Sequence, residues 1–145
     1  MRQISIPLPV RESIASHSIS AYPNEGCGVL FGLSAEHVLS IVGATGLPNR
    51  SSSPGNRYEI DPIAYAKAER QALTSGLCIL GFFHSHPESP ARPSLEDLQT
   101  ARGLFEFSRT YYVYAIQSVV NGQADELTFW ELSRERDAFV ELQIV

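Results

Sequence analysis

The chain has 145 residues and a formal net charge of −5, with 43% hydrophobic and 19% charged residues. This length fits a single domain, residues 1–145, that can bury a hydrophobic core. The acidic balance argues against broad binding of nucleic acid or of an anionic membrane, because both require basic surfaces.

Several features of the sequence bear on where the protein works. The first residues contain no apolar run of the kind found in a secretory signal. No stretch approaches about 18 consecutive apolar residues, so no membrane-spanning helix is predicted. Cys27 and Cys78 lie far apart and form no Cys-x-x-Cys pair, which favours reduced thiols over a disulfide. Together these features predict a cytoplasmic location.

The first half of the chain contains one helical and two extended patterns. Apolar residues spaced along residues 10–21 predict a short amphipathic helix. The apolar segment 26–33 predicts a buried strand, and residues 37–45 predict its hairpin partner. Residues 47–57 are rich in Ser, Pro, Gly and Asn, which is typical of a long loop.

The second half is expected to place a strand between two helices. Asp61 is a predicted N-cap and Pro62 a first-turn proline, so a helix is expected to run to about residue 75. Residues 77–86 are strongly apolar and predict a central strand. The remaining expected elements are a helix over 94–105, strands over 111–120 and 127–133, and an edge strand within 137–145. This order favours an α+β fold, in which a sheet packs against helices, over a doubly wound fold.

The segment HSHPESPARPSLED, residues 84–97, carries the clearest chemistry. Alternate side chains of a strand point to the same face, so the imidazoles of His84 and His86 should lie together. Both can reach a common ion at about 2.0–2.1 Å. Asp97, in the first turn of the next helix, can direct its carboxylate back toward them. Two His and one carboxylate leave a fourth position open, as in catalytic zinc sites.

Each part of this pattern also has a simpler interpretation. A His-x-His pair by itself is more often incidental than metal-binding. Ser94-x-x-Asp97 by itself is a variant of a helix capping box. Glu25 by itself is an acid beside a turn. Gly26 and Gly28 either let a substrate backbone approach closely or simply allow tight packing. The combination, at one strand end and the helix that follows it, favours a metal site.

The spacing of these residues resembles the signature of the JAMM (MPN+) zinc metallopeptidases. That signature is an upstream Glu, then His-x-His, seven residues, Ser, two residues and Asp, and this chain matches it without a gap. The segment YPNEGCGVLFG resembles the family's first strand and places Glu25 as its acid. The chain is most similar in size to the compact prokaryotic JAB/MPN type. The resemblance implies a single JAMM/MPN-like domain with a mixed, curved sheet flanked by helices, in the three-layer arrangement of cytidine-deaminase-like folds.

Roles for five residues follow from the resemblance. It implies that His84, His86 and Asp97 bind one zinc ion with a bound catalytic water, and it implies no other cofactor. Glu25 would accept the proton of that water and pass it to the departing amine. Ser94 would stabilise the negative oxygen of the tetrahedral intermediate. A His2Asp set also accommodates iron or manganese.

The resemblance also implies a substrate class. It implies hydrolysis of an amide or isopeptide bond after the C-terminal Gly-Gly of a ubiquitin-like or sulfur-carrier protein. The loop over residues 47–57 and the strand over 37–45 either form part of a groove for such a tail or are plain surface. Two alternative functions stay open: a JAMM peptidase for another substrate, such as phage-tail or peptide processing, and a noncatalytic MPN scaffold that binds partners. The intact motif argues against the scaffold. Whether two copies form a homodimer is also left open.

Overall fold

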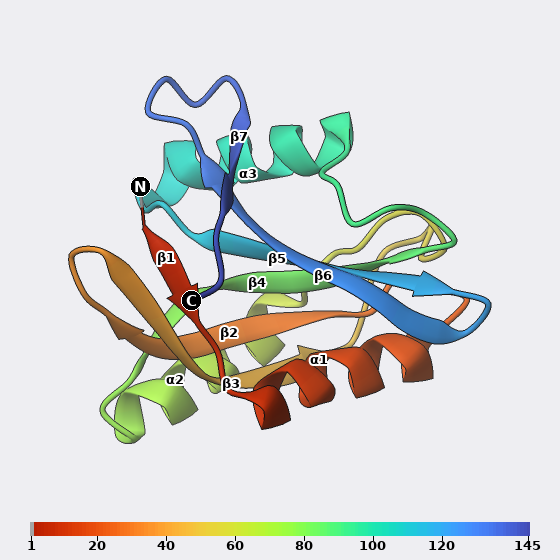
Figure 1. Ribbon diagram of the computed structural model, residues 1–145, viewed down its shortest axis with the longest axis horizontal. Helices are drawn as coiled ribbons and strands as arrows, with labels where there is room; N and C mark the ends of the chain where they lie inside the picture. Colours follow the sequence, from red (N-terminus) through yellow and green to blue (C-terminus); the bar gives the residue numbers. More distant parts are fainter. Residues whose placement is uncertain (1) are drawn as a thin grey trace.

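The computed structural model describes residues 2–145, which form three helices and one seven-stranded sheet (Figure 1). None of these helices is long and apolar enough to cross a membrane. In chain order the elements are β1 (Gln3–Ser5), α1 (Leu8–Ala21), β2 (Cys27–Ser34), β3 (Val38–Leu47), α2 (Pro62–Thr74), β4 (Cys78–Pro87), α3 (Leu95–Ser108), β5 (Val113–Val120), β6 (Gln123–Leu132) and β7 (Phe139–Leu142). The strand order across the sheet is β1-β3-β2-β4-β5-β6-β7. β1–β3 and β4–β5 are parallel pairs and the other pairs are antiparallel, which confirms a mixed sheet.

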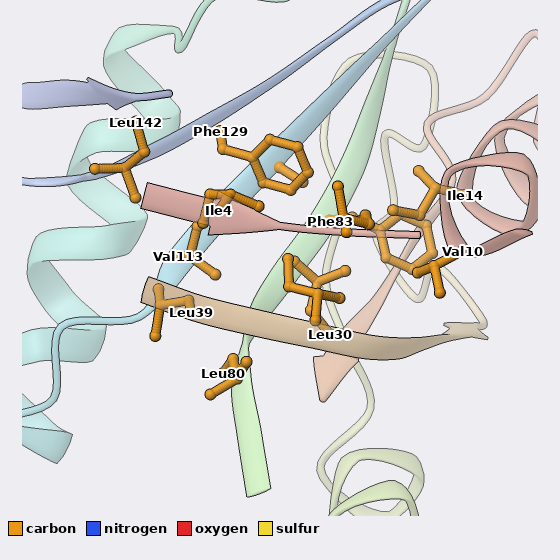
Figure 2. Close-up of a cluster of buried hydrophobic side chains, with 13 residues drawn as sticks. Ile4, Val10, Ile14, Leu30, Leu39, Leu80, Phe83, Val113, Phe129 and Leu142 are labelled. Atoms are coloured by element: carbon orange, nitrogen blue, oxygen red, sulfur yellow. The ribbon is translucent and has the colours of Figure 1, made fainter. Parts of the chain in front are cut away.

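The sheet curls until its two edges meet. Ile4 of β1 pairs with Ile144 beyond β7, with the Ile4 amide donating to the Gln143 carbonyl at 2.8 Å and the Val145 amide donating to the Ile4 carbonyl at 2.9 Å. Ile4 and Leu142 lie in the same buried cluster (Figure 2). The predicted C-terminal strand is therefore confirmed, whereas β1 was not predicted. Three residues give too short a pattern to detect, and β1 is stabilised by partners distant in the sequence.

Helices cover both faces of the sheet and produce three layers. Ile14 of α1 packs with Phe83 on the inner face (Figure 2). Ala68 of α2 and Phe105 of α3 pack with Phe82 on the outer face. Phe82 and Phe83 are neighbours in β4 and point to opposite faces, so one strand anchors both layers. Burial of each ring contributes about 1.5–3 kcal/mol. The expected three-layer arrangement is confirmed.

Side-chain caps fix where α2 and α3 begin. The Asp61 carboxylate accepts a hydrogen bond from the Ala64 amide at 3.0 Å, as the sequence predicts. At α3, the Ser94 hydroxyl accepts from the Asp97 amide at 3.0 Å, and Asp97 Oδ2 accepts from the Ser94 amide at 2.9 Å. This reciprocal pair satisfies amides that the first helical turn leaves free. It also sets the direction of the Asp97 carboxylate.

Two elements extend three or four residues beyond their predicted bounds. α3 continues to Ser108, about one turn beyond the predicted end at 105. β6 begins at Gln123, four residues before the predicted start at 127. The early start of β6 is explained by the dipeptide Asn121-Gly122, whose φ angles of 53° and 75° form a tight turn from β5 directly into β6. Asn-Gly is the preferred sequence for such a two-residue hairpin turn.

Gly26 and Gly28 serve close packing. A Cβ at Gly28 would overlap the Thr45 carbonyl of β3 and the Phe83 ring of β4. A Cβ at Gly26 would lie 3.2 Å from the Ala21 Cβ of α1. Both positions therefore face the protein interior, and the simpler of the two interpretations of these glycines applies.

Gly28→Ala should lower the free energy of unfolding by about 1–3 kcal/mol, because the added methyl group overpacks the interior. The matched control is Gly103→Ala in α3, where an added Cβ meets nothing within 4 Å. The free energy of unfolding of that variant should rise by about 0.5–1 kcal/mol, because alanine is more favourable than glycine in the interior of a helix. Urea unfolding of both variants measures the difference, and equal stabilities would contradict the close packing at Gly28.

Candidate metal centre

Three side chains converge between the end of β4 and the start of α3. The Nε2 atoms of His84 and His86 lie 3.1 Å apart. Asp97 Oδ1 lies 3.2 Å from His84 Nε2, and Asp97 Oδ2 lies 3.2 Å from His86 Nε2. Ligands of one tetrahedral ion, with bonds of about 2.0–2.1 Å, stand about 3.3 Å apart. The spacing of these donor atoms therefore fits a single ion, and the three residues form a group that can hold a metal.

The backbone explains why the two histidines meet. β4 lies between β2 and β5, and His84 is opposite Cys27 while His86 is opposite Ser118. Pairing with β2 as far as His84, and with β5 as far as Pro87, holds the strand extended, so both imidazoles project from the same face. The strand ends one residue later at Pro87, and the chain turns away at Glu88, whose φ is 59°. The metal-binding group thus sits where a central strand leaves the sheet.

The two imidazoles are oriented by different contacts. His86 Nδ1 lies 3.0 Å from the Pro90 carbonyl, which only accepts, so Nδ1 carries the proton and Nε2 faces Asp97. His84 Nδ1 is buried and is the one such side-chain N or O atom in residues 2–145 without a hydrogen-bond partner. The His84 ring instead stacks on Tyr58, with centroids 4.5 Å apart and planes inclined by 20°. Stacking therefore helps to fix His84.

The group favours a positive charge among its donor atoms. Burial by itself would raise the pKa of Asp97, but hydrogen bonds with His84 and His86 outweigh it and hold that pKa well below its usual range. Burial lowers the pKa of His86, yet its hydrogen bonds to Asp97 and to the Pro90 carbonyl raise it overall. A divalent cation supplies positive charge to all three donors at once. The residues present therefore fit a metal ion.

Glu25 lies beside this group, just before β2, and is 6% exposed. The loop over residues 47–57 holds its backbone: the Glu25 amide donates to the Pro54 carbonyl at 2.7 Å, and the Asn49 side chain donates to the Glu25 carbonyl at 3.0 Å. Burial raises the pKa of the Glu25 carboxyl to about 7, with His86 opposing the shift and Asp97 adding to it. A carboxyl group with a pKa near neutrality can both accept and release a proton.

Three adjoining cavities border the site. The first, the aromatic cavity, has a volume of about 590 Å³ and lies between α2, α3 and the outer face of the sheet. Its lining residues include Phe82, Tyr112 and Tyr114. It shares Tyr58 and Thr100 with a second cavity of about 310 Å³, the central cavity. A larger, apolar cavity therefore adjoins a smaller, polar one.

The central cavity adjoins a third, the outer cavity, of about 390 Å³. These two share Glu25 and Asn56. Asp97 lines the central cavity, whereas His86 and Ser94 line the outer one. The metal-binding group thus lies at the boundary between them. Figure 1 shows the loops before α2 and before α3 at the same end of the sheet.

The structure brings all five predicted site residues together. Each of them lines the central or the outer cavity or belongs to the metal-binding group between these two cavities. Ser94 is part of the capping box and also lines the outer cavity, and its hydroxyl accepts from the Asp97 amide. The hydrogen of that hydroxyl stays available for donation. Asp97 likewise combines its cap with contacts to His84 and His86. The capping box and the metal-binding arrangement therefore coexist.

The sequence did not predict how Asn49 and Tyr58 support the site. Asn49 organises the loop, because its Oδ1 accepts from the amides of Ser51 and Glu59 while its Nδ2 also donates to the Arg57 carbonyl at 2.9 Å. Asn among Ser, Pro and Gly signals a turn but does not reveal its partners. For Tyr58 no local signal exists. The loop lines the central and outer cavities, whereas no β3 residue lines any of the three, and a groove for a substrate tail stays a prediction.

Residues 7–133 match the model of a family described as prokaryotic homologs of the JAB domain. The chain therefore belongs to this family, which confirms the resemblance drawn from the motif. The match covers the three helices, the strands β2 to β6 and all five site residues.

Known proteins resemble the chain over much of its length. It is 36% identical over 98 residues to a probable TtuB-protein conjugate cleaving protease of Thermus thermophilus, a match that covers 67% of this chain and 62% of that protein. It is 33% identical over 120 residues to a desampylase of Haloferax volcanii, covering 80% and 81%. The solution structure of a Desulfitobacterium hafniense protein superposes with a TM-score of 0.83 at 28% identity, covering 99% of this chain and 92% of that one.

Proposed function

We propose that this protein is a zinc-dependent metallopeptidase. It would hydrolyse the amide or isopeptide bond that follows the C-terminal Gly-Gly of a ubiquitin-like or sulfur-carrier protein. The observation that carries the proposal is the convergence of the three donors from His84, His86 and Asp97 at the boundary of two cavities. Glu25 lines both of these cavities, beside the place where a scissile bond would cross.

Each site residue has a task in this proposal. His84, His86 and Asp97 would hold the ion, and two imidazoles with one carboxylate are a donor set of catalytic zinc. The bound ion would polarise the scissile carbonyl and lower the pKa of a water molecule at the site. Glu25 would take a proton from that water and deliver it to the departing amine. Ser94 would donate its hydroxyl hydrogen to the oxygen that becomes negative in the transition state.

The cavities support a protein with an extended tail as the substrate. The aromatic cavity is lined mainly by apolar side chains, and Phe107 at its edge is 91% exposed. A folded partner could bury this apolar surface, including the exposed Phe107 ring. The tail would then cross the central cavity, where glycines need the least space. The names of the Thermus and Haloferax relatives support a protein conjugate as the substrate.

The proposal predicts cleavage of a carrier that carries a peptide after its terminal Gly-Gly. The purified protein, loaded with zinc, is incubated with this fusion, with the same fusion bearing Leu-Leu in place of Gly-Gly, and with unrelated unstructured peptides. Mass spectrometry should show that the peptide after Gly-Gly is released and that the other substrates are cleaved more slowly. Cleavage of the peptides but not of the fusion would contradict the proposed substrate class. Absence of turnover on every substrate would favour the noncatalytic scaffold.

A further inference from the structure

We propose that the outer cavity receives the leaving group and that Arg92 there binds a carboxylate of that group. Arg92 would then determine specificity, favouring release of an amino acid with a free α-carboxylate over release of a lysine side chain of a protein. This inference rests on the proposed function and adds to it the chemical class of the leaving group.

The order of the cavities gives the direction of the substrate. The aromatic cavity adjoins the central cavity through Tyr58 and Thr100 but shares no lining residue with the outer cavity. A partner docked in the aromatic cavity would therefore approach the metal-binding group from the side of the central cavity. Whatever follows the scissile bond must continue beyond His86 and Asp97. The outer cavity, of about 390 Å³, is the space found there.

The charges of the two smaller cavities differ in a way that suits this direction. Arg57 lines the central cavity, but its charge is matched by Glu96, with Nε and Oε1 2.9 Å apart. Arg92 lines the outer cavity, is exposed, and makes no ion pair within residues 2–145. Its guanidinium is therefore a permanent positive charge available to a ligand.

The backbone connects Arg92 closely to the metal-binding group. Arg92 stands between Pro90-Ala91 and Pro93, and its amide donates to the Pro90 carbonyl at 2.8 Å. The same carbonyl contacts Nδ1 of His86 at 3.0 Å. Ala91 is fully buried, so this short segment is anchored to the core. The backbone of Arg92 is thus fixed relative to His86, while the guanidinium of Arg92 can reach into the outer cavity.

The reaction places a carboxylate near this charge only for one kind of substrate. In hydrolysis, the C–N bond breaks, water supplies the hydroxyl that completes the carboxyl group of the tail, and the amine takes up a proton. When the leaving group is an amino acid, its α-carboxylate is attached to the carbon that bears this amine. When the leaving group is a lysine side chain within a protein, no carboxylate lies so close. A guanidinium binds a carboxylate through two parallel hydrogen bonds, so Arg92 would favour the first kind.

Two matched substrates test the inference. Both are the glycine-tailed carrier with one alanine after Gly-Gly, in one case with a free α-carboxylate and in the other with a carboxamide. The zinc-loaded wild-type protein should cleave the carboxylate form with a kcat/KM about tenfold higher, mainly through KM, since one charge-assisted contact is lost with the carboxamide. Arg92→Gln should abolish this difference, and Arg92→Lys should restore part of it. Arg70→Gln, an exposed arginine on α2 outside the three cavities, is the control and should keep the wild-type ratio.

The outcomes separate the two proposals. Zinc content and urea unfolding establish that the Arg92 variants are folded. A wild-type ratio near one, or a ratio that is unchanged in Arg92→Gln, would overturn the role of Arg92 while the peptidase function stands. Failure of the wild-type protein to cleave either carrier would overturn the proposed function, and this inference with it.

Discussion

Glu25→Gln should reduce kcat/KM by about 10²–10⁴-fold and leave the zinc content unchanged. Glutamine has nearly the shape of glutamate but cannot accept a proton from water. Glu25 is also absent from the group of three residues that can hold a metal, so its replacement removes none of the proposed ligands. Cleavage of the glycine-tailed fusion, measured beside zinc stoichiometry on the same preparation, tests both parts of this expectation.

Glu12→Gln is the matched control for this experiment. Glu12 lies on α1, is exposed, and is outside the three cavities and the metal-binding group. The control should keep wild-type turnover and zinc content. Loss of zinc from Glu25→Gln would make Glu25 a ligand, and undiminished turnover would remove it from the reaction.

His86→Ala should lose both zinc and turnover. The substitution removes one of three converging donors and leaves Asp97 facing a single imidazole. Changes to groups that merely orient a ligand typically weaken metal binding by about 10–100-fold, so loss of a ligand should cost more than about 100-fold. Titration of the metal-free protein with zinc, followed by an activity assay at each point, measures the loss.

His37→Ala is the control for this second variant. His37 lies next to the start of β3, is largely exposed, and its Nε2 is 3.7 Å from the Glu36 carboxylate. Its replacement should change neither zinc binding nor turnover. If His86→Ala bound zinc as tightly as His37→Ala does, the proposed ligand set would be wrong. The contrast between Glu25→Gln and His86→Ala then separates a proton acceptor from a ligand.

The sequence alone indicated His84, His86 and Asp97 as a metal-binding group, because their arrangement is largely local, whereas Glu25 and the role of Ser94 were inferred from the resemblance to the JAMM family. The two-residue period of a strand places His84 and His86 on one face. The first turn of a helix places Asp97 where its carboxylate can point back toward the preceding segment. The same local rules predicted the cap at Asp61. Patterns of this kind extend over a few residues, so they can be recognised without knowledge of the fold.

Other features were decided by the tertiary structure. Closure of the sheet joins Ile4 to Ile144 from opposite ends of the chain, and β1 has too few residues to form a recognisable strand pattern. The stacking of Tyr58 on His84 and the availability of Arg92 depend on how loops distant in the sequence pack against each other. A sequence pattern reports the period and the ends of an element. The distances between elements arise only when burial of the shared core brings them together.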